Sequence, residues 1–371
     1  MKRALTLSLF ASLLFVIFLA SLAAGQDNQY PQARGIYLAG RHPDIAPKAS
    51  SQHLTIWKGG FKDLTGVNRH FLMVGTDPNA TNTTTTVPVV IVPIKMVYGA
   101  HNGNKTFDPM THKLPNGQTV MQMILASPIL NANVDFKQGG TDLGKTQYID
   151  AFQRGNFWGK NIKKNSKYHV LLGKPTVLPE QTIKVPVGMG FVTTNPLSGR
   201  GLIGTFDFNL MDSTLQGYIK KFNQIQPNTL PIFITYDIYL GSGNSCGCIG
   251  GYHFLNGAPP NGQTYSYTTS LDQGTNEFAQ DVSALSHEIG EWMDDPFFGS
   301  NTVGCQDNSQ LEVGDPLEGR ANGGAFPYKV GNFTYNLQSL VFLGYFGAPR
   351  STSVHKWLSF QNDEQNVCPG Q

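Results

Sequence analysis

Residues 283–296 combine polar side chains with a regular apolar spacing, and they constrain the fold more than any other stretch. On a helix that turns by about 100° per residue, the apolar residues in and just before this stretch gather on one stripe. The stripe consists of Phe278, Val282, Leu285, Ile289, Trp292 and Met293. His287 and Glu291 fall on the opposite side, and Glu288 falls between them and the apolar edge. The pattern predicts a helix that packs on a core through one face and carries polar chemistry on the other.

The polar residues of this helix have the spacing of metal ligands. His287 and Glu291 stand at i and i+4, about 6 Å apart on one helical face, so one cation can bridge an imidazole nitrogen and a carboxylate oxygen. Glu288 points elsewhere, but it can reach a water in an open coordination position, which makes it the candidate general base. A third ligand must come from outside the helix, and Glu312, followed by Asp315, is the candidate.

These residues resemble a known motif. The pattern His-Glu-x-x-Glu followed by Glu-x-x-Asp is similar to the HExxH…ExxxD pattern of zincin metallopeptidases, in particular the gluzincin-like branch. The resemblance implies a zinc peptidase in which His287, Glu291 and Glu312 bind Zn²⁺ and Glu288 is the base. It also implies that Asp315 orients His287 and that the substrate is a peptide or protein.

The sequence departs from the gluzincin-like pattern in two places. Glu291 stands where that family has its second histidine, and the spacing from Glu312 to Asp315 is one residue shorter, so these two residues could exchange roles. A set with one histidine and two carboxylates also tolerates other divalent ions. Residues 281–316 are loosely similar, in addition, to secreted bacterial proteins of unknown function and to exordium-type wall proteins. A non-catalytic secreted or wall-associated protein is therefore the alternative to a hydrolase.

The N-terminus has the pattern of an export signal. Lys2 and Arg3 precede an apolar run from Ala4 to about Leu22, and the small residues Ala23-Ala24-Gly25 follow. We expect cleavage after Gly25 and a protein that is extracellular or periplasmic, without a membrane association afterwards. The alternative is an uncleaved anchor, since the run approaches the ~18 residues that span a bilayer.

Four cysteines in an apparently exported chain predict disulfides. A bridge between Cys246 and Cys248 would be strained at that spacing, so we expect each of them to pair with one of Cys305 and Cys368. A thiolate zinc site is disfavoured because no CxxC pair is present.

Charge excludes one class of partner. Charged residues make up 14% of the chain, against about 25% in typical proteins, and the formal net charge is +2. Because no dense run of lysine and arginine occurs, no basic face is available to neutralise phosphates, and we expect no nucleic-acid partner. The oligomeric state cannot be predicted from these features.

The order of apolar patterns predicts an α+β fold. The resemblance to zincins implies a zincin-like arrangement, with a mixed twisted sheet, a backing helix and a central metal-site helix.

Four segments are expected: a signal peptide (1–25), a loosely structured segment (26–86), an α+β domain with the site helix (87–296) and a mostly irregular C-terminal subdomain (297–371) that completes the site. Strands are expected at residues 87–98, as an edge or bulged strand because of its prolines, and at residues 231–240.

Three further helices are predicted from helical spacing, around residues 120–127, at residues 146–155 and after an N-cap at Asp212-Ser213. Asp150 and Arg154 would form an exposed i, i+4 pair on the second of these helices. Four polar residues outside the motif are expected to have structural roles: His253, Tyr328, Tyr335 and His355. The alternative for Tyr328, Tyr335 and His355 is to donate to an oxyanion, and the alternative for His253 is to lie close to the site.

Overall fold

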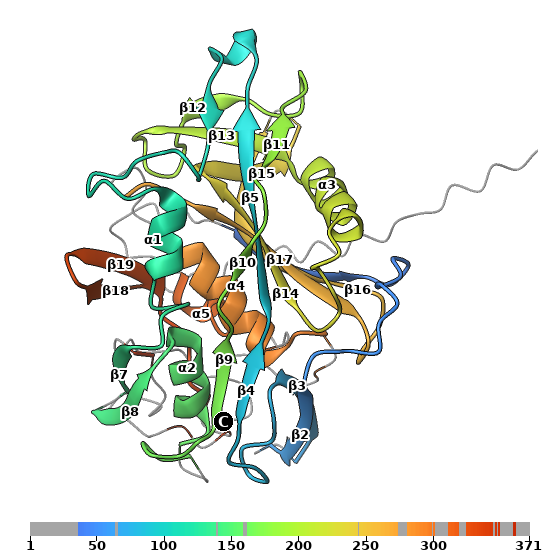
Figure 1. The fold of residues 1–371 in the computed structure, drawn as a ribbon, viewed down its shortest axis with the longest axis vertical. Coiled ribbons are helices and arrows are strands. Elements are labelled where there is room, and N and C mark those ends of the chain that lie inside the picture. Colours follow the sequence, from blue (N-terminus) through green and yellow to red (C-terminus); the bar gives the residue numbers. More distant parts are fainter. Residues whose placement is uncertain are drawn as a thin grey trace, which may run out of the picture. The chain divides into compact units, whose positions relative to one another are not determined.

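A mixed β-sheet of 11 strands dominates the described part of the protein in its computed structural model (Figure 1). The structure describes residues 36–63, 66–138, 140–158, 162–243, 245–273, 280–298, 300, 311–318, 324–343, 346, 348 and 359–360. All of them belong to one compact unit, Gln32–Gln371.

The expected α+β zincin-like fold is wrong. Of the described residues, 40% lie in strands and 17% in helices, and the mixed sheet curls into a half-barrel. The physical reason is that many strands carry polar residues, glycine or proline, which weakens the apolar alternation by which a strand is recognised. The strand Gln263–Ser270 shows this, since all eight of its residues are buried although every one is a threonine, serine, tyrosine or glutamine.

The main path of the sheet runs through strands that come from most of the chain. In spatial order they are β10 (Thr176–Val177), β5 (Val89–Val97), β14 (Leu230–Tyr236), β17 (Gln263–Ser270), β16 (Ser245–Asn256), β15 (Ile238–Ser242), β13 (Leu202–Asp207) and β12 (Val192–Thr194). Outside this path, β1 (Ile36–His42) pairs in parallel with β16, while β6 (Thr106–Phe107) and β11 (Gln181–Lys184) pair with β5.

Two-stranded sheets surround the main sheet in the described part. They are β2 (Ile56–Lys62) with β3 (Asn68–Val74), β4 (Thr84–Val87) with β9 (His169–Leu172), β7 (Val134–Gln138) with β8 (Thr141–Thr146), and β18 (Ala325–Val330) with β19 (Phe333–Gln338). The segment 26–86, for which little regular structure was expected, thus contains β1, β2 and β3 in its described part.

The two prolines of the predicted edge strand, Pro88 and Pro93, lie between stretches of residues that pair with different strands, where a missing N–H group disturbs the sheet least. Pro88 lies between β4 and β5, and Pro93 lies between the residues of β5 that pair with β10 and those that pair with β11. Because β5 has β14 on its other side, it is an interior strand, and the edge interpretation is wrong.

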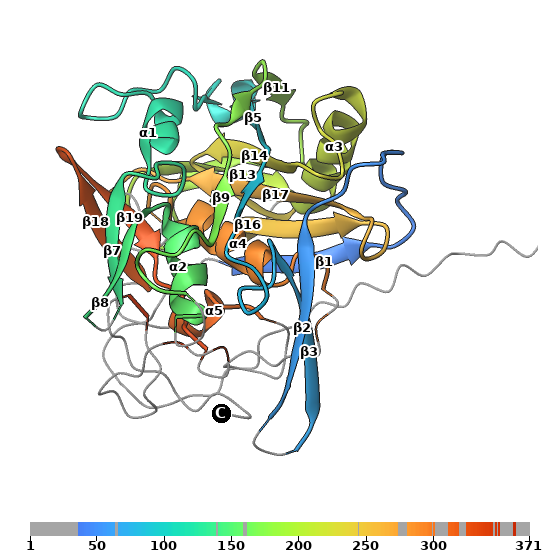
Figure 2. The same ribbon diagram turned by 60° about the horizontal axis from the view of Figure 1, so that its bottom comes forward.

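Helices cover both faces of the sheet. Successive residues of a strand point to opposite faces, and β16 shows the consequence. Tyr252 donates to Asp212 of α3 (Phe208–Lys221), whereas His253 contacts Glu288 of α4 (Ser283–Asp294). Figure 2 shows α3 and α4 on either side of the sheet. Helix α4 therefore lies directly on the face of the sheet that carries His253.

The central helix was predicted correctly, but its environment was not. The four apolar residues of the stripe that lie within α4 are buried, as expected: Leu285, Ile289, Trp292 and Met293. The polar face is buried as well, because α4 packs against β16, β17, β19 and α2 (Tyr148–Asn156) (Figure 1). The histidine and carboxylates of α4 therefore lie inside the protein, where each needs a specific partner.

The other predicted helices are present, with two corrections. α1 (Val120–Ala126) and α2 match the expected segments, but α3 begins earlier than expected, with Asp207 as its N-cap. Asp150 and Arg154 do not form an exposed pair, since their exposed fractions are 0% and 1%. Arg154 instead donates to backbone carbonyl groups of the segment before β9, at Lys163, Lys164, Ser166 and Tyr168, and to Leu143.

The strand predicted at residues 231–240 is divided by Asp237, which has a φ of 49° and separates β14 from β15. Asp237 is buried, and its Oδ1 atom accepts from the backbone N–H of Asp272 at 2.9 Å. Burial and then the charge of Asp272 raise the pKa of Asp237 to about 8. The ionised carboxylate is therefore disfavoured in the folded protein.

The replacement Asp237→Asn is expected to remove a pH-dependent loss of stability. The pKa of this acid rises from 3.8 to about 8 on folding. The contribution of protonated Asp237 to the free energy of unfolding is therefore complete below pH 3.8 and is lost as the pH rises through about 8. Asparagine tolerates the positive φ and retains the acceptor. We expect equal urea midpoints at pH 4 and a variant that is more stable at pH 9 by up to about 6 kcal/mol, since the pKa rises by about four and each pKa unit corresponds to about 1.36 kcal/mol. The exposed Asp135→Asn is the control, and a constant difference across this range would contradict the prediction.

Candidate metal centre

Two groups of side chains in the described residues have the geometry of metal ligands, and they share one member. His287, Glu291 and Asp315 form the first group, and His253, Glu291 and Glu312 form the second. Within each group the ligand atoms lie within 4.8 Å of one another. Helix α4 supplies His287 and Glu291, and β16 supplies His253. Glu312 lies in the segment before α5 (Asp315–Glu318), and Asp315 is the first residue of α5.

His287 is held tightly in the first group. Its Nε2 atom lies 3.1 Å from Glu291 Oε2 and 3.6 Å from Asp315 Oδ1. The ring stacks on Tyr37 of β1, with 3.8 Å between ring centroids. Gly314 approaches the same ring so closely that a Cβ atom at this position would lie 2.3 Å from His287 Nδ1. The surroundings thus fix the imidazole with its Nε2 atom beside two carboxylates, as binding of a divalent cation requires.

His253 of the second group forms a buried pair with Glu288, which belongs to neither group. His253 Nδ1 and Glu288 Oε2 are 3.0 Å apart, and the exposed fractions of these side chains are 1% and 0%. Gly251 of β16 makes room for Glu288, since a Cβ atom there would lie 2.6 Å from Oε1. His253 Nε2 is buried without a hydrogen-bond partner among the described residues. A neutral imidazole that donates from Nδ1 presents the lone pair of Nε2, which is how histidine binds metals.

Glu291 connects the two groups. Its Oε2 atom lies 4.0 Å from His253 Nδ1, in addition to the contact with His287, and its Oε1 atom accepts from the backbone N–H of Gly314 at 3.1 Å. Burial and then the charge of Asp315 raise the pKa of Glu291 well above its usual value. Burial and then the charge of Glu291 do the same to the pKa of Glu312.

The imidazoles are shifted in the opposite direction. Burial lowers the pKa of His253 to about 3 and that of His287 to about 4. Both rings are therefore neutral at physiological pH, which is the form that binds a metal. Neutral rings cannot compensate the charge of the nearby carboxylates, whereas a divalent cation can, and the donor set fits such an ion.

The predicted site residues come together in a different grouping. His287 and Glu291 lie together, as expected, and Asp315 joins them. Glu312 instead lies with Glu291 and His253. Glu288, the predicted base, contacts His253.

Sequence reasoning assigned His253 a structural role and therefore missed it as a site residue. The signal that could have found it is the pair Gly250-Gly251 just before it, because glycine in a strand often marks a close approach of another element.

The remaining candidates do not join this cluster in the described structure. Tyr328 donates to the carbonyl of Asp135, and Tyr335 donates to that of Met123 at 3.2 Å. Asp294, at the end of α4, accepts a hydrogen bond from Gln153 of α2, so it connects the two helices. His355 lies outside the described residues.

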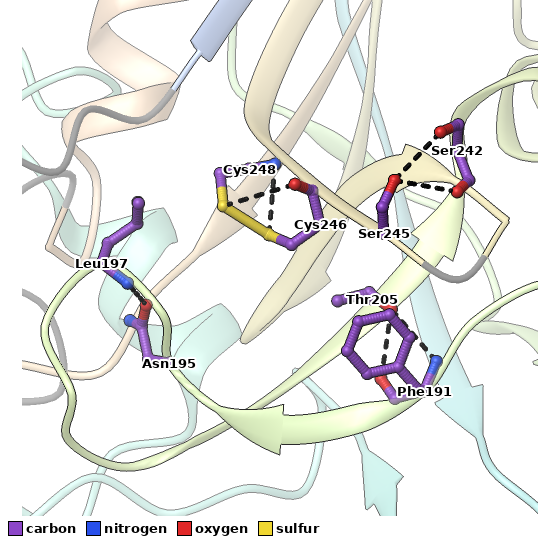
Figure 3. The surroundings of a disulfide bond; sticks show 8 residues. All are labelled: Phe191, Asn195, Leu197, Thr205, Ser242, Ser245, Cys246 and Cys248. Carbon is purple, nitrogen blue, oxygen red and sulfur yellow. Dashed lines mark hydrogen bonds between the residues drawn. A yellow bond between two sulfur atoms is a disulfide. The ribbon is translucent and has the colours of Figure 1, made fainter.

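The cysteine pairing differs from the expectation. Cys246 and Cys248 form a disulfide within β16 (Figure 3), so the expected pairing of each with Cys305 or Cys368 is wrong. Cys248 adopts a left-handed conformation, with a φ of 52°, and the two Cα atoms are 5.0 Å apart. This separation lies within the ~4.4–6.8 Å that disulfides require. Cys305 and Cys368 lie outside the described residues.

Comparison with protein-family models, curated proteins and solved structures found no match. The resemblance to gluzincin-like peptidases therefore depends on the motif residues alone. Among the helices that the structure describes, none has the length and hydropathy needed to cross a membrane. The predicted signal peptide lies outside the described residues.

Proposed function

We propose that the protein is a secreted metal-dependent hydrolase, most simply a zinc peptidase, whose ion is held by His287, Glu291 and Asp315. One observation supports this most: the three side chains converge while exposure rises from 0% at His287 to 39% at Asp315. Catalytic zinc sites typically combine three protein ligands with one position open to water or substrate. Access from the side of Asp315 fits that pattern.

The neighbouring residues have distinct tasks in this proposal. A bound divalent ion lowers the pKa of a coordinated water and polarises a substrate carbonyl. Glu288, next to His287 in α4, accepts the proton, and His253 holds its carboxylate through the 3.0 Å contact. Tyr37 and Gly314 keep the ring of His287 in place. Secretion follows from the N-terminal pattern, and a peptide substrate follows from the motif resemblance.

A non-catalytic, secreted or wall-associated protein that uses the metal for stability is the second candidate. The burial of His253, His287 and Glu288 favours it, because structural metal sites are closed. In that case Glu288 only orients His253, as carboxylates often do for histidine ligands.

The variant Glu288→Gln separates the two candidates. Glutamine retains an oxygen that accepts from His253 Nδ1–H but cannot accept a proton. For a hydrolase we expect unchanged metal content, measured by elemental mass spectrometry on the purified protein, and a loss of peptide hydrolysis of about 10²-fold or more.

The matched control is Glu180→Gln, a carboxylate that lies near Lys95 and not in the cluster. Wild-type protein without stoichiometric metal would exclude both candidates. Metal-loaded protein that hydrolyses no member of a broad peptide panel, or equally active wild type and Glu288→Gln, would exclude the assigned mechanism.

A further inference from the structure

We propose that the site holds two divalent ions bridged by the carboxylate of Glu291, the second of them bound by His253 and Glu312. This inference rests on the proposed metal binding and adds a second ion to it. The two ligand groups share Glu291 and otherwise contain different residues, with one imidazole and one further carboxylate for each ion.

The position of Glu291 fits a bridging ligand. Its Oε2 atom lies 3.1 Å from His287 Nε2 in the first group and 4.0 Å from His253 Nδ1 in the second. Two donors that each lie about 2.1 Å from a zinc ion can be separated by up to about 4.2 Å, so Glu291 and His287 Nε2 can share one ion. In the second group, the ligand atoms of His253, Glu291 and Glu312 lie within 4.8 Å of one another. Ions in two-metal hydrolase sites lie about 3.5–4 Å apart, a distance that one carboxylate spans.

His253 has the orientation of a ligand. Its Nδ1 atom is engaged by Glu288, while Nε2 is buried without a hydrogen-bond partner among the described residues. A buried polar atom without a partner costs about 1–3 kcal/mol, and a bound cation removes that cost. Phe298 stacks on the ring, with 5.1 Å between centroids, and stabilises this orientation.

The charge of the second group also favours a cation. Glu291 and Glu312 carry two negative charges when ionised, and the third member, His253, adds no charge as a neutral ligand. Among the described residues, the ion-pair partners of Glu291 are His253 and His287 and no lysine or arginine. A divalent ion bound by His253 and Glu312 can supply the compensating charge that this part of the cluster needs.

The test counts ions. Full-length protein is loaded with Zn²⁺, freed of excess metal and analysed by elemental mass spectrometry. We expect two ions per chain in the wild type and one in His253→Gln. The matched control is His169→Gln, because His169 Nδ1 also contacts a buried carboxylate, that of Asp150 at 2.7 Å, but lies outside the cluster. The control is expected to keep two ions.

A second measurement does not depend on any variant. Loading the wild type with Mn²⁺ is expected to give the electron paramagnetic resonance spectrum of an exchange-coupled pair, and not the six-line spectrum of isolated Mn²⁺. One ion per chain with an uncoupled spectrum would overturn the second ion and leave the proposed hydrolase intact. No bound ion would overturn both. Two ions that persist in a folded His253→Gln protein would overturn the assignment of His253.

Discussion

Glu291→Gln is expected to remove all tightly bound metal from the protein. Glu291 belongs to both ligand groups, so loss of its negative charge weakens both at once. Glutamine has the same shape and can still accept from the backbone N–H of Gly314, so the fold of the cluster is preserved. The result is measured as ions per chain and as the melting temperature with and without Zn²⁺. A ligand present at 100 times its Kd stabilises a protein by about 2.7 kcal/mol, and the variant should lack this increment.

Glu312→Gln provides the comparison for this prediction. Glu312 belongs to one group only, so its replacement should remove one ion and leave the His287 group loaded. Stoichiometric metal in Glu291→Gln would show that the ions are held elsewhere.

Gly314→Ala is expected to be the most destabilising small substitution near the site. The added Cβ would lie 2.3 Å from Nδ1 and 2.7 Å from Cε1 of His287, closer than atoms approach in folded proteins. The ring has little freedom to move, because His287 is fully buried and stacks on Tyr37. We expect a loss of about 2–4 kcal/mol in urea unfolding and loss of the ion at His287.

The control for Gly314→Ala is Gly217→Ala in α3. No heavy atom lies within 4 Å of a Cβ at Gly217, and alanine is the better helix former, so this variant should gain about 0.5–1 kcal/mol. If both alanines had the same effect, crowding against His287 would not be the cause.

The sequence predicted the central helix and half of the cluster because both are local. The spacing of His287 and Glu291 depends only on helical geometry, and the apolar stripe of α4 is buried as its period requires. Asp315 was expected to orient His287, and it lies 3.6 Å from Nε2 of that ring. Which of Asp315 and Glu312 lies with His287 depends on the path of the segment before α5, and no periodicity in the sequence encodes that path.

The position of His253 at the site and the fold class could not be predicted from local patterns, because both depend on contacts between distant segments of the chain. His253 pairs with Ser266 in the β16–β17 register, and only this pairing together with the docking of α4 brings it to Glu288. A shift of one residue would have turned it to the α3 face. The share of the chain that lies in strands was underestimated, because buried strands such as β17 are rich in threonine, serine and tyrosine and lack the apolar pattern of a core strand.

The stacking of Tyr37 on His287 has a consequence for how the proposed ions would enter the site. Tyr37 lies on β1, which joins β16 only when segments more than 200 residues apart in the chain have met. Such long-range pairing is slow to form, and afterwards the fully buried His253 is reached only through local opening, whereas the first group stays accessible from the side of Asp315. The proposed second ion would then be captured while the chain folds and exchanged slowly later. The metal supply of the compartment where β1 docks, more than the metal concentration where the protein works, would decide which ion the site carries.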